Sequence, residues 1–110
     1  MSNLLDREAM MEHFGGDSDL IKTVAEQFLS SYEEMLSNIE VAIKSGVAKD
    51  LEHSGHTLKG ASSYFYCESV VELAKKLEYM GREGNIEGSQ GIFEELKENT
   101  IKLAQELKQF

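Results

Sequence analysis

His56, Lys59 and Gly60 stand close together in the stretch His-Thr-Leu-Lys-Gly, and their side chains suggest a specific chemistry. An imidazole titrates near neutral pH and can act as a nucleophile. On a helix, a lysine three residues later lies one turn away and offers a positive charge to an incoming anion. Glycine inside a helix costs about 0.5–1 kcal/mol relative to alanine, so Gly60 requires a reason. A nucleophile, a cation and cleared space together predict a phosphoryl acceptor.

The helical wheel predicts which way these residues face. At about 100° per residue, one side of the helix gathers the residues that would face the core: Leu51, Ser54, Leu58, Ala61, Ser62 and Phe65. His56 falls opposite this group and is expected to be exposed, with Glu52, His53 and Ser63 on the same side. Gly55 lies at the flank of the core, which predicts close helix packing. Gly60 lies on the solvent side, where the approach of another molecule is the remaining reason for it.

Apolar periodicity and helix start and stop signals predict five helical segments. The first has Asp6 as a possible N-cap and ends before Gly15. For the fourth, Ser69 and Glu72 form a capping-box pattern. The segments cover about residues 6–14, 19–45, 48–66, 69 to the Gly81–Gly84 region, and 90–108, the last with apolar positions at Phe93, Leu96, Ile101, Leu103, Ala104 and Leu107.

Short connections between long helices favour antiparallel neighbours, and each helix has one apolar stripe to bury. We therefore expect an all-α fold: an up-and-down antiparallel four-helix bundle with a short extra N-terminal helix. The 110 residues are enough for one domain. Residues 1–16 would form the N-terminal helix and turn, and residues 17–108 the helical bundle.

Composition limits the function classes. The formal net charge is −9, which argues against binding to nucleic acid or to an anionic membrane. Cys67 is the only cysteine, so no internal disulfide is possible. The sequence shows neither a signal-peptide pattern nor an apolar run of the roughly 20 residues needed to cross a bilayer. We expect a cytoplasmic protein.

The sequence resembles a known family at two places. "HTLKGASS" (residues 56–63) is similar to the H-x-x-K-G-x-S/A-x motif of histidine-containing phosphotransfer (HPt) domains, which act in two-component phosphorelays. "SVVELAKKLEYMGREGNIE" (residues 69–87) resembles the family's next segment, where an A-x-x-L-E run precedes a basic residue and a Gly-rich turn. The resemblance extends over about residues 17–107.

The resemblance implies roles for four residues. His56 would be the phosphorylated residue, Lys59 would stabilise the phosphoryl group, and Gly60 would leave room for a receiver domain. Glu78 matches the family's polar side chain that accepts a hydrogen bond from the imidazole. Such a carboxylate would fix the tautomer and leave Nε2 free as the nucleophile. Lys75 and Arg82 share a helical stripe with Glu78 and could flank the same site as partner-binding cations, together with Glu52, His53 and Ser63.

The resemblance also implies the partners. A receiver domain of a response regulator, or a hybrid sensor histidine kinase, would exchange the phosphoryl group with His56. The chain itself is expected to need no cofactor and no metal, with Mg²⁺ held by the receiver domain, and to act as a monomer. It is expected not to be an enzyme in its own right, because the sequence has no phosphate-cradling loop and no room for an ATP-binding domain.

The sequence departs from the family at the end of the motif helix. Family members commonly have Leu-Gly-Ala where this chain has Phe65, Tyr66 and Cys67. We expect the change to affect the geometry of the helix end, and a tyrosine there would narrow the partner surface. The change leaves the nucleophile untouched.

Three other interpretations fit parts of the pattern. His53 and His56 with Glu52 could bind a metal, although zinc requires three or four well-placed ligands. The dimerisation helix of a histidine kinase usually has an acidic residue after its histidine and a proline soon after. Here Thr57 follows His56 and the sequence has no proline. A purely structural helical bundle would leave Gly60 unexplained.

Overall fold

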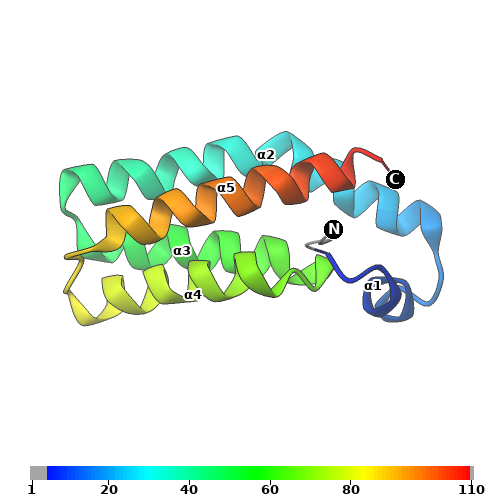
Figure 1. Cartoon of the computed structure of the whole chain (residues 1–110), viewed down its shortest axis with the longest axis horizontal. Coiled ribbons are helices and arrows are strands. Elements are labelled where there is room, and N and C mark those ends of the chain that lie inside the picture. The colour runs from blue at the N-terminus through cyan, green and yellow to red at the C-terminus, as the bar shows by residue number, and fades with distance from the viewer. Residues whose placement is uncertain (1–4, 110) are drawn as a thin grey trace.

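The computed structural model describes residues 5–109, which form an antiparallel four-helix bundle with a short helix at one end (Figure 1). The elements follow in this order: α1 (Arg7–His13), α2 (Ser18–Ser45), α3 (Ala48–Ser62), the 3₁₀ turn η1 (Ser63–Phe65), α4 (Glu68–Glu83) and α5 (Ser89–Leu107). The predicted fold class is confirmed. Each helix of the bundle packs against the next, and α5 closes the bundle by packing against α2.

Local signals determine four of the helix ends. Asp6 and Asp17 are the N-caps of α1 and α2, and each side chain accepts a hydrogen bond from a backbone N–H three residues later, at 3.0 Å. Gly46 and Gly84 end α2 and α4 in the left-handed conformation, with φ of 72° and 73°. This conformation is easy for glycine and satisfies the last helical carbonyl groups.

The start of α4 differs from the prediction. The capping box at Ser69 and Glu72 is wrong, because the helix begins at Glu68 with Cys67 as its N-cap and no side-chain cap hydrogen bond. Cys67 is completely buried, and the Ser69 hydroxyl lies 3.7 Å from its sulfur. Burial of the cysteine therefore sets the entry of the chain into α4, and the serine side chain does not.

The predicted third helix is also too long at its C-terminal end. The α-helix stops at Ser62, the chain continues as η1, and Tyr66 adopts the left-handed conformation with φ 52° and ψ 39°. This conformation costs a residue other than glycine about 1–2 kcal/mol. The Tyr66 hydroxyl forms a hydrogen bond with Nδ1 of His13 at 3.0 Å, and the two rings pack edge to face. Contacts with α1 thus offset the strain at the position where the family commonly has glycine.

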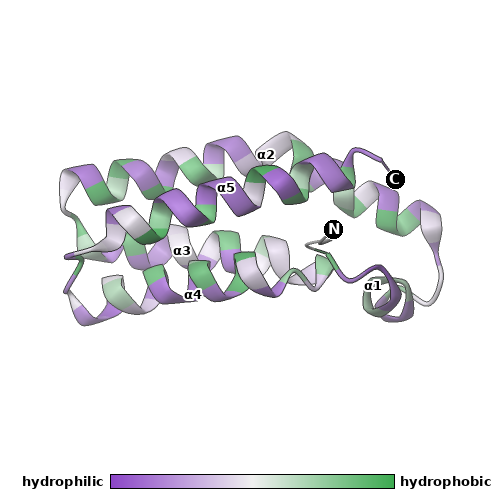
Figure 2. Ribbon diagram, viewed as in Figure 1, coloured by the Kyte–Doolittle hydropathy of each residue, from purple (hydrophilic) through white to green (hydrophobic). Residues whose placement is uncertain are grey.

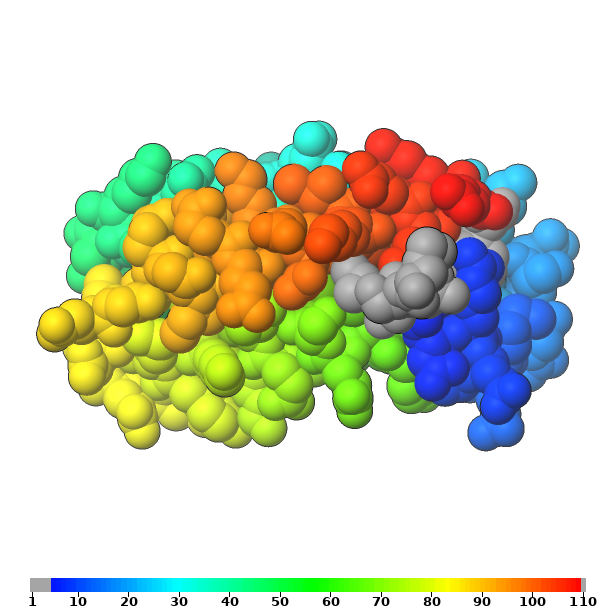
Figure 3. All heavy atoms as spheres, viewed as in Figure 1, coloured from blue at the N-terminus to red at the C-terminus, as the bar shows by residue number. Residues whose placement is uncertain are grey.

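The core lies between the helices, where apolar residues recur along one side of each (Figure 2). The core stripe of α5 includes a polar residue, Thr100, which is fully buried and donates its hydroxyl to the carbonyl of Leu96 at 2.7 Å. Ile101, one of the predicted apolar positions, is instead 37% exposed. At one end of the bundle lie α1 and the first residues of α2 (Figure 3). The backbone N–H of Asp6, just before α1, donates a hydrogen bond to the carbonyl of Phe65 in η1.

Candidate functional site

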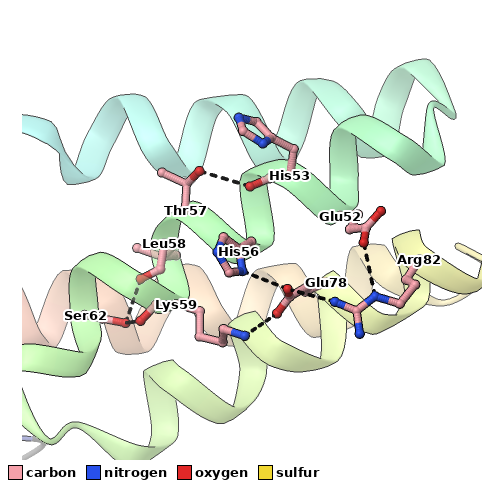
Figure 4. Close-up of polar contacts among 9 residues, drawn as sticks. All are labelled: Glu52, His53, His56, Thr57, Leu58, Lys59, Ser62, Glu78 and Arg82. Atoms are coloured by element: carbon pink, nitrogen blue, oxygen red, sulfur yellow. Dashed lines mark hydrogen bonds and ion pairs between the residues drawn. The ribbon is translucent and has the colours of Figure 1, made fainter.

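His56 projects from the middle of α3 toward solvent, with 64% of its side chain exposed. Its Nδ1 lies 2.8 Å from Oε2 of Glu78, which comes from α4 and has only 3% of its side chain exposed (Figure 4). The structure thus places the exposed imidazole on a buried carboxylate. The wheel predicted the exposure of His56, and the predicted contact with Glu78 is present.

Glu78 contacts two cations as well as the imidazole. The ammonium of Lys59 lies 2.6 Å from Oε1, and Nη2 of Arg82 donates to Oε2 at 3.2 Å. Burial of Glu78 opposes ionisation, but the ammonium of Lys59 and the hydrogen bond from His56 outweigh it and lower the pKa of the carboxyl group. Glu78 is therefore a carboxylate at neutral pH.

This carboxylate determines the tautomer of His56. An ionised carboxylate only accepts hydrogen bonds, so the imidazole must carry its proton on Nδ1. The lone pair then resides on Nε2, on the side of the ring away from Glu78. A neutral imidazole in this tautomer is a nucleophile with a fixed orientation.

Two glycines bring α3 and α4 close enough for these contacts. Gly55 precedes His56, and a Cβ atom there would lie 2.9 Å from the backbone nitrogen of Glu78. Gly81 precedes Arg82, and a Cβ atom there would overlap the backbone nitrogen of Glu52 and lie 2.5 Å from the carbonyl oxygen of Ala48. Each glycine thus lets one helix touch the backbone of the other, directly beside a pair of interacting side chains. The prediction that Gly55 serves helix packing is confirmed.

Gly60 has the opposite environment. A Cβ atom placed there would meet no atom within 4 Å, and the residue is exposed one turn beyond His56. Packing within the chain therefore gives no reason for this glycine. Its position beside His56 leaves the surface next to the imidazole open.

Arg82 is held at the edge of the site by three groups. Besides its contact with Glu78, its Nε donates to Oε2 of Glu52 at 3.1 Å, and the guanidinium lies 5.1 Å from the centre of the Tyr79 ring. The hydrogen bond to Glu52 raises the pKa of Arg82 above its already high usual value. The guanidinium therefore stays charged beside the imidazole.

The other predicted partner-binding residues lie around this cluster without joining it. The ammonium of Lys75 lies 5.6 Å above the Tyr79 ring, so Lys75 and Arg82 flank the tyrosine. The Ser63 hydroxyl donates to the carbonyl of Gly60 at 2.8 Å. His53 is exposed, and its carbonyl accepts the Thr57 hydroxyl. These residues border the exposed face on which His56 lies.

Sequence reasoning missed three residues of this region. Tyr79 lies between two cations, and the spacing of Lys75, Tyr79 and Arg82 on one helix could have indicated it. Lys49 lines the hollow beside His56, and it stands seven residues before the histidine, on the same side of the helix. Gly81 was interpreted only as part of a helix end, because nothing in its local sequence shows which backbone it touches.

The structure also bears on the metal-binding interpretation and on membrane-spanning helices. Among residues 5–109, no group of three or more His, Cys, Asp and Glu side chains is arranged to hold a metal ion, and Glu52 is engaged with Arg82. The metal-binding interpretation is therefore not favoured. In the same part of the chain, no helix is long and apolar enough to cross a membrane.

Three comparisons relate this chain to known proteins. The chain is 28% identical over 109 residues to the phosphorelay intermediate protein rdeA of Dictyostelium discoideum, covering 96% of this chain but only 41% of that protein. Its fold matches the crystal structure of histidine-containing phosphotransfer protein B (HptB) from Pseudomonas aeruginosa PAO1 with a TM-score of 0.88, at 23% identity over 99% of this chain and 95% of the other. The profile of the Hpt domain family matches residues 23–109. This chain belongs to the Hpt domain family.

Proposed function

We propose that this chain is a phosphorelay carrier that accepts a phosphoryl group on Nε2 of His56 and passes it to or from an aspartate of a receiver domain. The observation that supports this most directly is the pair formed by the exposed imidazole and the buried, ionised Glu78. The family assignment and the similarity to a phosphorelay intermediate support the same function.

The transfer step requires no added acid or base. The Nε2 lone pair attacks phosphorus in the acyl phosphate of the donor, the new N–P bond forms, and the P–O bond to the donor aspartate breaks to release its carboxylate. The proton on Nδ1 stays in place, so the ring becomes positively charged as the bond forms. Glu78, 2.8 Å from Nδ1, stabilises that charge. In the reverse direction, a receiver aspartate attacks the same phosphorus.

Neighbouring residues serve the phosphoryl group and the partner in this proposal. Lys59, on the same helix, supplies positive charge, and Gly60 leaves space for the receiver surface. Mg²⁺ would be held by the receiver domain, and this chain would contribute no metal ligand. Positioning within the complex then provides most of the catalysis.

The family assignment favours a carrier over a kinase, since Hpt phosphotransfer proteins are carriers. The partners in this proposal are response-regulator receiver domains or hybrid sensor kinases. We further propose that the carrier acts as a monomer in the cytoplasm. The purely structural alternative accounts for neither the open surface at Gly60 nor the charge cluster on Glu78.

A phosphotransfer profile tests the proposed function. Each receiver domain of the host is phosphorylated with labelled phosphate and mixed with this chain, and transfer of label is followed over seconds to minutes. We expect rapid transfer with at least one receiver, to a bond that acid breaks and alkali does not, as for phosphohistidine. If no receiver and no hybrid kinase of the host exchanges label with the chain, the proposal is rejected.

Gly60 distinguishes docking from packing, because the two roles predict opposite effects on stability. With no atom near its Cβ position, Gly60→Ala should stabilise the domain by about 0.5–1 kcal/mol. Gly60→Gln should also fold, since glutamine is a good helix former and its amide reaches water. Transfer from a receiver should nevertheless slow from Gly to Ala to Gln, because each larger side chain fills space beside His56.

Thermal melts and transfer rates on the three proteins check this prediction. Phosphorylation by the small donor phosphoramidate serves as the control, because it requires no docked protein and should change little. A Gly60→Gln protein that is stable and exchanges with receivers at the wild-type rate would mean that no partner approaches this surface closely.

A further inference from the structure

A shallow hollow of about 330 Å³ lies beside His56 on the side of Arg82. Its lining residues are Lys49, Glu52, His53, His56, Glu78 and Arg82. Lys59, the cation of the sequence motif, does not line it and contacts the other oxygen of Glu78 (Figure 4). A phosphoryl group on the imidazole that extends into this hollow would approach two cations, Lys49 and Arg82, of which Arg82 also contacts Glu78.

Arg82 is oriented but retains free donors. Its Nε is bound to Glu52 and its Nη2 to Glu78, while the Tyr79 ring packs against the guanidinium. Within residues 5–109, its Nη1 donates no hydrogen bond. Nη2 and the His56 Nδ1 contact the same carboxylate oxygen, which places the guanidinium next to the imidazole. Planar guanidinium groups bind phosphoryl oxygens well.

Glu52 binds Arg82, whereas Glu78 binds both Arg82 and the His56 imidazole. Oε2 of Glu52 accepts a hydrogen bond from Arg82 across the two helices, whereas the His56 imidazole is hydrogen-bonded to Glu78. One third of the Glu52 side chain is exposed, at 34%, so its charge is only partly screened by solvent. Glu52 therefore offsets the charge of one of the two cations that line the hollow, and adds a negative charge of its own.

We propose that Glu52 sets how firmly the site holds a phosphoryl group on His56, by competing with that group for Arg82. This inference rests on the proposed phosphocarrier function. A carrier must release its phosphoryl group, and without Glu52 the guanidinium of Arg82 would keep only Glu78 as an acidic partner and would hold the nearly dianionic group more tightly. Glu52 is thus a positioning residue that acts through Arg82 and weakens the phosphorylated state.

Equilibrium with a small donor measures this effect without any partner protein. Phosphoramidate transfers its phosphoryl group to Nε2 and releases ammonia, so a fixed ratio of phosphoramidate to ammonia sets the phosphorylated fraction, which ³¹P NMR reports. Glu52→Gln keeps the shape of the side chain and removes its charge. We expect it to raise the ratio of phosphorylated to free protein about threefold to tenfold, and Arg82→Gln to lower it by a similar factor.

The double variant tests the route through Arg82. In the Arg82→Gln background, Glu52→Gln should change the ratio by less than about twofold, because the competing cation is absent. Glu95→Gln serves as the matched control, since it removes the same charge from an exposed position on α5, and should leave the ratio unchanged.

Two results would overturn the inference. One is a Glu52→Gln protein whose ratio equals that of the Glu95→Gln control or falls below the wild type. The other is an equally large effect of Glu52→Gln with and without Arg82, which would show direct repulsion. Failure of the wild type to become phosphorylated at His56 is a separate outcome, and it would reject the proposed function itself.

Discussion

Replacing His56 with glutamine should abolish phosphoryl uptake while leaving the fold intact. An amide has no nucleophilic lone pair comparable to that of Nε2, so no N–P bond can form at this position. The side chain is 64% exposed, and glutamine is a good helix former. Its amide can donate to Glu78 in place of Nδ1, so the free energy of unfolding should change by no more than about 1 kcal/mol.

Phosphorylation by phosphoramidate and by a cognate receiver, with the modified residue located by mass spectrometry under alkaline conditions, measures this effect. His53→Gln is the matched control, because His53 is an exposed histidine one turn away on the same helix. It should retain the wild-type extent of labelling. Acid-labile label in the His56→Gln protein, at His53 or at His13, would contradict the assignment of the phosphoacceptor.

Gly81→Ala should be the most destabilising of the small substitutions considered for this chain. The added methyl group would overlap the Glu52 backbone, lying 2.8 Å from its Cα, and the neighbouring Ala48 carbonyl. Backbone atoms cannot rotate away as a side chain can, so α3 and α4 must separate. Overpacking of this kind costs about 1–3 kcal/mol or more, which exceeds the gain of about 1 kcal/mol in helix propensity.

Separation of the two helices should also disturb the hydrogen bond between Arg82 and Glu52. Arg82 directly follows Gly81, and the Glu52 backbone is what a methyl group at Gly81 would displace. We expect a melting temperature lower by roughly 5–15 °C and weaker phosphorylation of the folded protein. Gly91→Ala is the control, because Gly91 is a helical glycine on α5 with no atom within 4 Å of its Cβ position. That variant should be slightly more stable than the wild type. A Gly81→Ala protein as stable as Gly91→Ala would show that the helices do not pack in backbone contact.

Much of the site lies on a single helix, and this part was predictable from the sequence. The exposure of His56, the burial of Leu51, Leu58 and Phe65, and the open surface at Gly60 all follow from helical periodicity. Because residues three, four and seven apart share a helix face regardless of what the helix packs against, no tertiary information was needed. The contact of Glu78 with His56 was expected only from the resemblance to the HPt family.

The start of α4 shows where local signals failed. Ser69 and Glu72 have the residue types and spacing of a capping box, but Cys67 enters the core and becomes the N-cap, two residues before Ser69. Likewise, Lys75 and Arg82 occupy one stripe, yet only Arg82 reaches Glu78, while Lys75 lies over Tyr79. Tertiary burial and competition among neighbouring side chains decided both outcomes.

The sequence by itself determined the helices, the apolar stripes that make them form a bundle, and the face of α3 that carries His56, Lys59 and Gly60. The tertiary structure alone decided that Glu52 pairs with Arg82 and that Gly81 is a packing residue. The physical reason is that such contacts join two helices. They depend on the distance and rotation between α3 and α4, which arise from packing of the whole interface and from the absence of a Cβ atom at Gly55 and Gly81.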